Sequence, residues 1–244
     1  MTTLPAAAIA QPPESIPSLL HRFDREHDLA KKEQLLRTVT DQDRGAGPAL
    51  LRLARSTSNW DTRWMAMRGM AALHYTACAP FLRASLKDSD WGIRANAARA
   101  LGDLRIRNAA TPLLAMFARE QEPGAVQQAS LALRLLDIKG AAPFIREKLP
   151  RFTGQTRYWL IQALGALGGD GDAPLIAEYL DFSDIPGAMD AEAATYALEE
   201  LAGVSFGPHA TGASTVPPPE TLAARAWWAS HKALWPSCAD CRRK

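Results

Sequence analysis

Prolines recur at a nearly constant spacing through the middle of this 244-residue sequence. Successive intervals are 32, 32, 31 and 31 residues, and apolar residues follow each proline. The five positions are Pro48, Pro80, Pro112, Pro143 and Pro174. Because proline lacks a backbone N–H and is tolerated in the first turn of a helix, each of them predicts a helix start. The regular period predicts a repeat protein.

A second helix is predicted before each of the last four prolines, because apolar residues recur there at i, i+4, i+7, i+8 and i+11. The clearest face consists of Ile93, Ala97, Ala100, Leu101 and Leu104. The same offsets give faces that begin at Thr62, Ala125, Thr156 and, more weakly, Asp190. Small residues at i+4 and i+7 let neighbouring helices approach closely. The pattern therefore predicts helices that stack.

The predicted fold class is all-α, since no stretch keeps an alternation of period two for more than a few residues. One pair of helices cannot bury its own apolar face, so we expect an α-solenoid, a curved stack of antiparallel helix pairs closed by a C-terminal capping helix. The expected boundaries are a disordered or draped segment 1–15, a solenoid 16–204, a Pro/Gly-rich linker 205–220, an aromatic capping helix 221–235 and a tail 236–244.

One unit carries a family signature. The run from Asp90 to Gly102, followed by Ala110 to Leu114, resembles the short HEAT repeat of the phycobilisome-lyase type, an armadillo-like family. The resemblance covers roughly 47–203, with Gln127 in place of an arginine in the third unit and Asp190 in an apolar slot in the fifth. It implies that the proline helices line the concave groove, and that the arginines opening the other helices form a hydrogen-bonded ladder between repeats. Those arginines are Arg63, Arg94 and Arg157.

Basic side chains on the proline helices are the candidate binding residues of this groove. They are Arg52, Arg55, Arg83, Lys87, Arg119 and Arg146. Residues 61–180 hold 15 basic and 11 acidic side chains, whereas residues 181–204 hold 6 acidic side chains and no basic one. A groove graded from basic to acidic follows, in which the arginines would pair with carboxylates or phosphates. The alternative is a solvated face without a ligand.

No catalytic residue is predicted. No histidine stands with Glu or another His four positions away, and no nucleophile, kinase or phosphate-loop signature appears. Cys238 and Cys241 form a lone Cys-x-x-Cys, and a structural zinc site needs two further ligands. We therefore predict no metal and no cofactor.

The amino-acid composition argues against several classes of function. The 28 basic and 26 acidic residues leave a formal charge of +2, which gives no reason to expect strong nucleic-acid binding. No apolar run reaches the length of about 18 residues that a membrane span needs. The 3 cysteines are too few for a disulfide framework and fit a cytoplasmic protein.

The predicted function is a non-catalytic scaffold or adaptor whose groove binds a protein or peptide partner, with an acidic partner as one option. Two alternatives come from related families. One is a bilin lyase-like factor that attaches a chromophore, for which no nucleophile or cofactor site is found. The other is a DNA-binding protein of the HEAT-like alkylpurine glycosylase type, for which Trp64, Trp91 and Trp159 would be available for stacking.

Overall fold

The structure is a computed structural model that describes residues 14–181, 185–209 and 216–234. Helices are its only regular secondary structure within these ranges, which confirms the all-α prediction. The chain divides into two compact units, Met1–Tyr75 and Thr76–Lys244. The division falls inside the predicted solenoid. Most of the predicted N-terminal segment, the tail 236–244, Cys238 and Cys241 lie outside the described residues.

The first unit contains two helix pairs, and its α-helices are α1 (Ile16–Arg25), α2 (Leu29–Gln42), α3 (Gly47–Ser56) and α4 (Trp60–Ala72). Helix α1 packs on α2, and α4 packs on both α2 and α3. The ammonium of Lys32, which is fully buried, donates a hydrogen bond of 2.8 Å to the hydroxyl of Thr62. A charged side chain thus joins the two pairs inside this unit.

The second unit continues the alternation of a short proline helix and a longer helix. Its α-helices are α5 (Ala79–Ser85), α6 (Trp91–Asp103), α7 (Ala110–Arg119), α8 (Pro123–Leu135), α9 (Ala142–Lys148), α10 (Gly154–Leu167), α11 (Ala173–Ala177), α12 (Ile185–Ala202) and α13 (Pro219–His231). Short 3-10 turns are η1 (Thr76–Cys78), η2 (Arg107–Ala109), η3 (Lys139–Ala141), η4 (Leu149–Arg151), η5 (Asp170–Asp172), η6 (Glu178–Leu180) and η7 (Lys232–Leu234). Every repeated proline lies in the first turn of a helix, as predicted.

The termini of the longer helices repeat the same local chemistry. The side chains of Asn59 and Asp90 accept hydrogen bonds from the first turns of α4 and α6 and so begin these helices. After the last turns of α4, α6 and α8, one residue adopts a left-handed backbone with φ between 52° and 54°: His74, Arg105 and Asp137. That conformation reverses the chain and lets the next N–H bond a carbonyl five residues earlier. The turns therefore recur in register with the prolines.

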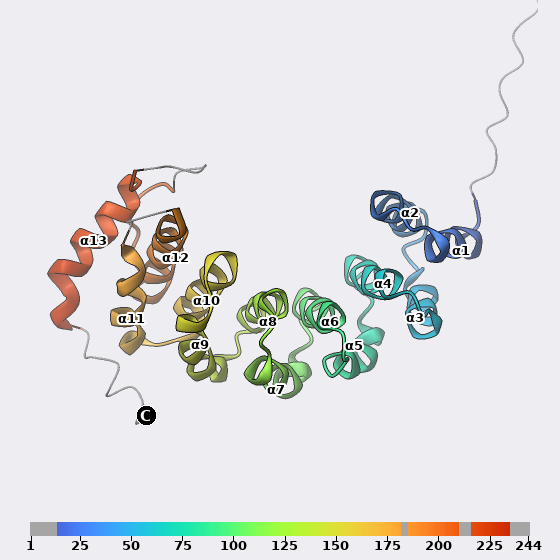
Figure 1. Cartoon of the computed structure of the whole chain (residues 1–244), viewed down its shortest axis with the longest axis horizontal. Coiled ribbons are helices and arrows are strands. Elements are labelled where there is room, and N and C mark those ends of the chain that lie inside the picture. The colour runs from blue at the N-terminus through green and yellow to red at the C-terminus, as the bar shows by residue number, and fades with distance from the viewer. Residues whose placement is uncertain (1–13, 182–184, 210–215, 235–244) are drawn as a thin grey trace, which may run out of the picture. The chain divides into compact units, whose positions relative to one another are not determined.

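The second unit has two rows of helices (Figure 1). Helices α6, α8, α10 and α12 follow one another on one side, and α5, α7, α9 and α11 on the other. The longer helices pack directly on one another, whereas the proline helices pack mainly on the longer ones. Within this unit the row of longer helices is consequently the inner, concave side of the curve. The expectation that proline helices line the concave side is wrong here.

Glycine explains why the longer helices form the inner row. A Cβ added to Gly102 would lie 2.8 Å from the Cα of Ala132, and one added to Gly165 would lie 2.6 Å from the Cα of Ala197. These glycines sit one position after the predicted Leu of α6 and α10. They let the backbones of α6 and α8, and of α10 and α12, come closer than any side chain would permit.

Replacing Gly165 with Ala is expected to destabilise the second unit by roughly 1–3 kcal/mol, because the added methyl group overlaps the backbone of α12. Urea denaturation followed by circular dichroism measures the loss. Gly140→Ala is the matched control, since its new Cβ would meet only Leu114 at an ordinary 3.7 Å. Equal stability of Gly165→Ala and the parent protein would contradict the close approach.

The predicted core faces are buried. Of the α6 face, Ile93, Ala97, Ala100 and Leu101 are at most 2% exposed. The capping helix is also present, because α13 packs on α12 and η6 and buries Ala224 completely. Leu222 of this helix is 51% exposed. The buried residues of α13 are Glu220, Thr221 and Ala224, whereas its aromatic residues Trp227 and Trp228 are half-buried.

Candidate functional site

The six predicted binding residues are divided between the two units. Arg52 and Arg55 are exposed on α3 in the first unit. The other four belong to the second unit, at or just beyond the ends of proline helices: Arg83, Lys87, Arg119 and Arg146. Arg83, Arg119 and Arg146 belong to helices of the outer row of that unit, and Lys87 lies in the loop between α5 and α6.

Two of these four residues hold neighbouring repeats together. The guanidinium of Arg146 bonds both carboxylate oxygens of Asp172 at 2.5 and 2.8 Å, and Asp172 is 1% exposed. Arg83, at the equivalent position of α5, donates to the side-chain oxygen of Asn108 at 2.8 Å. Each pair ties a proline helix to the 3-10 turn of the following repeat. A structural role therefore accounts for Arg83 and Arg146.

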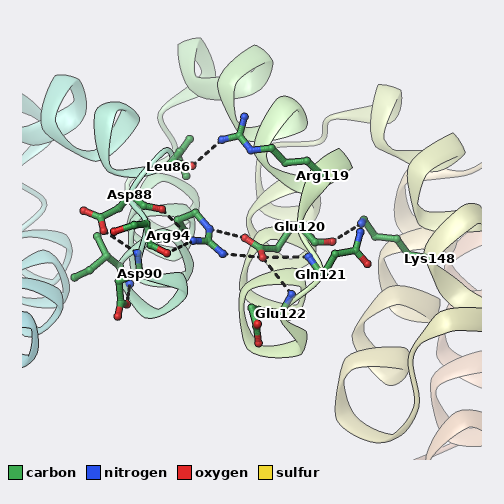
Figure 2. A network of polar contacts seen from close by, with 11 residues as sticks. Leu86, Asp88, Asp90, Arg94, Arg119, Glu120, Gln121, Glu122 and Lys148 are labelled. Atoms are coloured by element: carbon green, nitrogen blue, oxygen red, sulfur yellow. Dashed lines mark hydrogen bonds and ion pairs between the residues drawn. The ribbon is translucent and has the colours of Figure 1, made fainter.

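The other two residues, Lys87 and Arg119, open onto a shared cleft. Its volume is about 440 Å³, and its lining is Lys87, Asp88, Arg94, Arg119 and Glu120. The loop between α5 and α6 supplies one wall, and the end of α7 supplies the other. Figure 2 shows how Arg94 reaches from the first turn of α6 across to Glu120. We call this site the Lys87–Arg119 cleft.

Arg94 organises the floor of the Lys87–Arg119 cleft. Its Nε and Nη2 atoms donate to the two carboxylate oxygens of Glu120 at 2.7 and 2.9 Å. Its Nη1 atom donates to the carbonyls of Asp88 and Ser89 at 3.0 and 2.9 Å. The hydrogen bond with Glu120 raises the pKa of Arg94. This bidentate pair fixes one inter-repeat loop against the next.

Glu120 is the acceptor at the centre of the network. Its side chain is 5% exposed, and Oε1 also accepts the backbone N–H groups of Gln121 and Glu122 at 3.1 Å each. Burial opposes ionisation of this carboxyl, but the hydrogen bonds from Arg94 and from the backbone outweigh it and lower its pKa. Glu120 is thus an ionised carboxylate with a structural role, and both of its oxygens accept hydrogen bonds.

A buried lysine supports the same loop from the other side. The ammonium of Lys148 donates to the carbonyls of Ala118 and Glu120 at 3.3 and 2.8 Å, and lies 5.3 Å from the ring centre of Phe117. Burial lowers the pKa of this lysine, whose residue is 3% exposed. No sequence motif marked Lys148, because it stands among the charged residues Arg146, Glu147 and Arg151.

The predicted arginine ladder is present with one change. Arg63 donates to the carbonyl of Thr57 at 3.1 Å, the same offset at which Arg94 bonds Asp88. Arg157 pairs with Asp190 at 2.5 Å, which explains the acidic residue in the apolar slot of the fifth unit. In the third unit the arginine position is held by the fully buried Val126, one residue before the expected Gln127.

The inner face of α8, α10 and α12 carries a second group of polar and aromatic side chains. Arg134 of α8 forms an ion pair of 2.9 Å with Glu200 of α12, which spans α10 between them. Burial raises the pKa of Tyr158 to about 12, and Glu192 and Tyr196 add to this effect. Tyr196 in turn stacks on His209, with ring centres 3.8 Å apart.

No cluster of potential metal ligands occurs among the described residues, which do not include Cys238 and Cys241. Cys78 is buried, and burial raises the pKa of its thiol to about 11, so it is a poor nucleophile. None of the described helices is long and apolar enough to cross a membrane.

Parts of this chain are similar to known proteins. Residues 47–134, from the start of α3 into α8, match the family model of HEAT repeats. This part of the chain therefore has the sequence pattern of HEAT repeats. Among solved structures, the chain is similar to the complex of CpcE and CpcF of phycocyanin lyase from Nostoc sp. PCC7120. The TM-score is 0.55 at 17% identity, over 82% of this chain and 80% of the other. None of the curated proteins compared with it matches. At this identity the likeness establishes the solenoid fold.

Proposed function

We propose that this protein is a non-catalytic scaffold or adaptor that binds a protein or peptide partner along its repeats. The observation that carries the proposal is the inner face of the second unit. Tyr158 and Tyr196 are partly exposed there, and the charged groups of Arg134 and Glu192 act electrostatically on Tyr158. Tyrosine and arginine are the side chains most often found at the energetic centres of protein interfaces.

Rigidity supports the same proposal. These side chains project from long helices whose opposite faces are buried, so the surface exists before a partner arrives and little ordering cost accompanies binding. The similar solved structure is itself a complex between two chains of a lyase. That likeness also motivates the competing function, in which the chain attaches a bilin chromophore to an acceptor protein.

One experiment separates the two functions. The tagged chain is used for affinity capture from its native cells, with Tyr158→Ala/Tyr196→Ala as the test variant and Ala115→Asp, on the exposed side of α7, as the control. A scaffold is expected to retain a protein that the double tyrosine variant loses by about tenfold and the control keeps.

The chain is also incubated with a bilin and its acceptor protein. Covalent transfer of the bilin above background would overturn the non-catalytic proposal. If the double tyrosine variant still captured every protein that the parent chain captures, the inner face would not be the binding surface.

A further inference from the structure

Lys87 and Arg119 bring two positive side chains to one cleft without acidic partners of their own. Both residues are exposed. The ammonium of Lys87 has no hydrogen bond or ion pair with the described residues, and Arg119 makes one long hydrogen bond of 3.3 Å, from Nη2 to the carbonyl of Leu86. Most donors of the Arg119 guanidinium and all three of the ammonium are therefore available at the mouth of the cleft.

The acidic groups of the cleft already accept hydrogen bonds from other groups of the protein. Both oxygens of Glu120 accept from Arg94, and one of them accepts two backbone N–H groups as well. Asp88 accepts the backbone N–H of Asp90 at 2.9 Å. Because these carboxylates accept hydrogen bonds that hold the loops, they do not neutralise Lys87 and Arg119 by direct contact.

We propose that the Lys87–Arg119 cleft binds one carboxylate from an acidic segment of the partner, held between the ammonium of Lys87 and the guanidinium of Arg119. This proposal rests on the scaffold function and adds the chemical class of the partner. Guanidinium groups bind carboxylates through paired N–H donors, and lysine adds a second charge.

The charge balance of the cleft favours a carboxylate over a phosphate. Its lining carries three cationic and two anionic side chains, which leaves one positive charge unmatched. A carboxylate brings one negative charge, whereas a phosphate monoester near neutral pH brings nearly two and would stand close to Asp88 and Glu120. The buried ammonium of Lys148, whose hydrogen bonds go to carbonyls, adds a modest positive potential from behind.

A binding titration tests the proposal with the full chain. The probe is a short fluorescein-labelled peptide of repeated Glu-Gly, and fluorescence anisotropy is measured at low and at high salt. A Gln-Gly peptide is the matched uncharged probe, and inorganic phosphate and duplex DNA serve as competitors. The variants are Lys87→Gln, Arg119→Gln and their double mutant. Arg107→Gln, another exposed arginine but outside the cleft, is the control.

The Glu-Gly peptide is expected to bind more tightly than the Gln-Gly peptide, and salt should weaken it. Each cleft substitution should weaken binding by roughly fivefold to tenfold, and Arg107→Gln should leave it unchanged. Thermal melting should stay constant in all of these variants, because the altered side chains are exposed.

Equal binding by the double mutant and the parent chain would overturn the proposal. Displacement of the peptide by phosphate or DNA at lower concentration than by free Glu-Gly peptide would also overturn it, in favour of a phosphate-bearing ligand. The scaffold function would survive either result, since the inner-face experiment tests it with Lys87 and Arg119 intact.

Discussion

Replacing Leu101 with Asp is expected to abolish cooperative folding of the second unit. Leu101 is fully buried at the centre of the predicted α6 face. The substitution removes its apolar contacts and places a carboxylate in the buried core, at a cost of more than about 4 kcal/mol. Whole domains are stable by only about 5–15 kcal/mol. Thermal and urea unfolding followed by circular dichroism measure the loss.

Ala115→Asp is the control for this prediction, because it introduces the same side chain at an exposed position of α7. Its cost should stay below about 1 kcal/mol, which reflects helix propensity alone. A cooperative transition of Leu101→Asp within a few degrees of the parent chain would mean that the faces of the longer helices are not the core of the stack.

Removal of the Glu120 carboxylate is the second large effect. Glu120→Ala leaves the guanidinium of Arg94 partly buried, at 16% exposure, without its counter-charge, and it also deprives two backbone N–H groups of their acceptor. We expect a loss of about 3 kcal/mol in the free energy of unfolding, near the lower end for broken buried pairs. Urea denaturation of the full chain measures it.

A double-mutant cycle locates that loss. Because Arg94→Ala removes the charge that Glu120→Ala strands, the two losses should sum to more than the loss of the double variant. The exposed pair of Glu147 and Arg151 provides the control, with side chains 59% and 52% exposed and an expected coupling below about 0.5 kcal/mol. Additive losses for Arg94 and Glu120 would contradict a coupled pair between repeats.

Acid should weaken the same pair. Since the folded state lowers the pKa of Glu120 below its ordinary 4.5, the ionised carboxylate contributes its full stabilisation above that value and loses it as pH falls through the folded pKa. The stability difference between the parent chain and Glu120→Gln should therefore shrink as the pH falls below about 5. A difference that grows on acidification would have the wrong sign for this assignment.

Much of the fold could be predicted from local residue chemistry. Proline marks a helix start wherever it occurs in a sequence, and the faces around Leu101 and its equivalents show their burial through helical spacing alone. The ladder position of Arg94 followed from the family resemblance. Its partner did not, because Glu120 lies 26 residues away in a loop, and no local pattern distinguishes a structural acid from a solvated one.

The candidate site, too, could be predicted from the sequence only in part. The sequence by itself determined that helical hairpins of equal length stack, and that Lys87 and Arg119 are basic residues at equivalent places in successive repeats. Only the tertiary structure decided which row of helices is concave, since that depends on how closely Gly102 and Gly165 let backbones approach. It also decided that Arg83 and Arg146 are held in contacts between repeats while Lys87 and Arg119 face one cleft. Helix spacing is a property of neighbouring residues, whereas charge pairing depends on distances that folding creates.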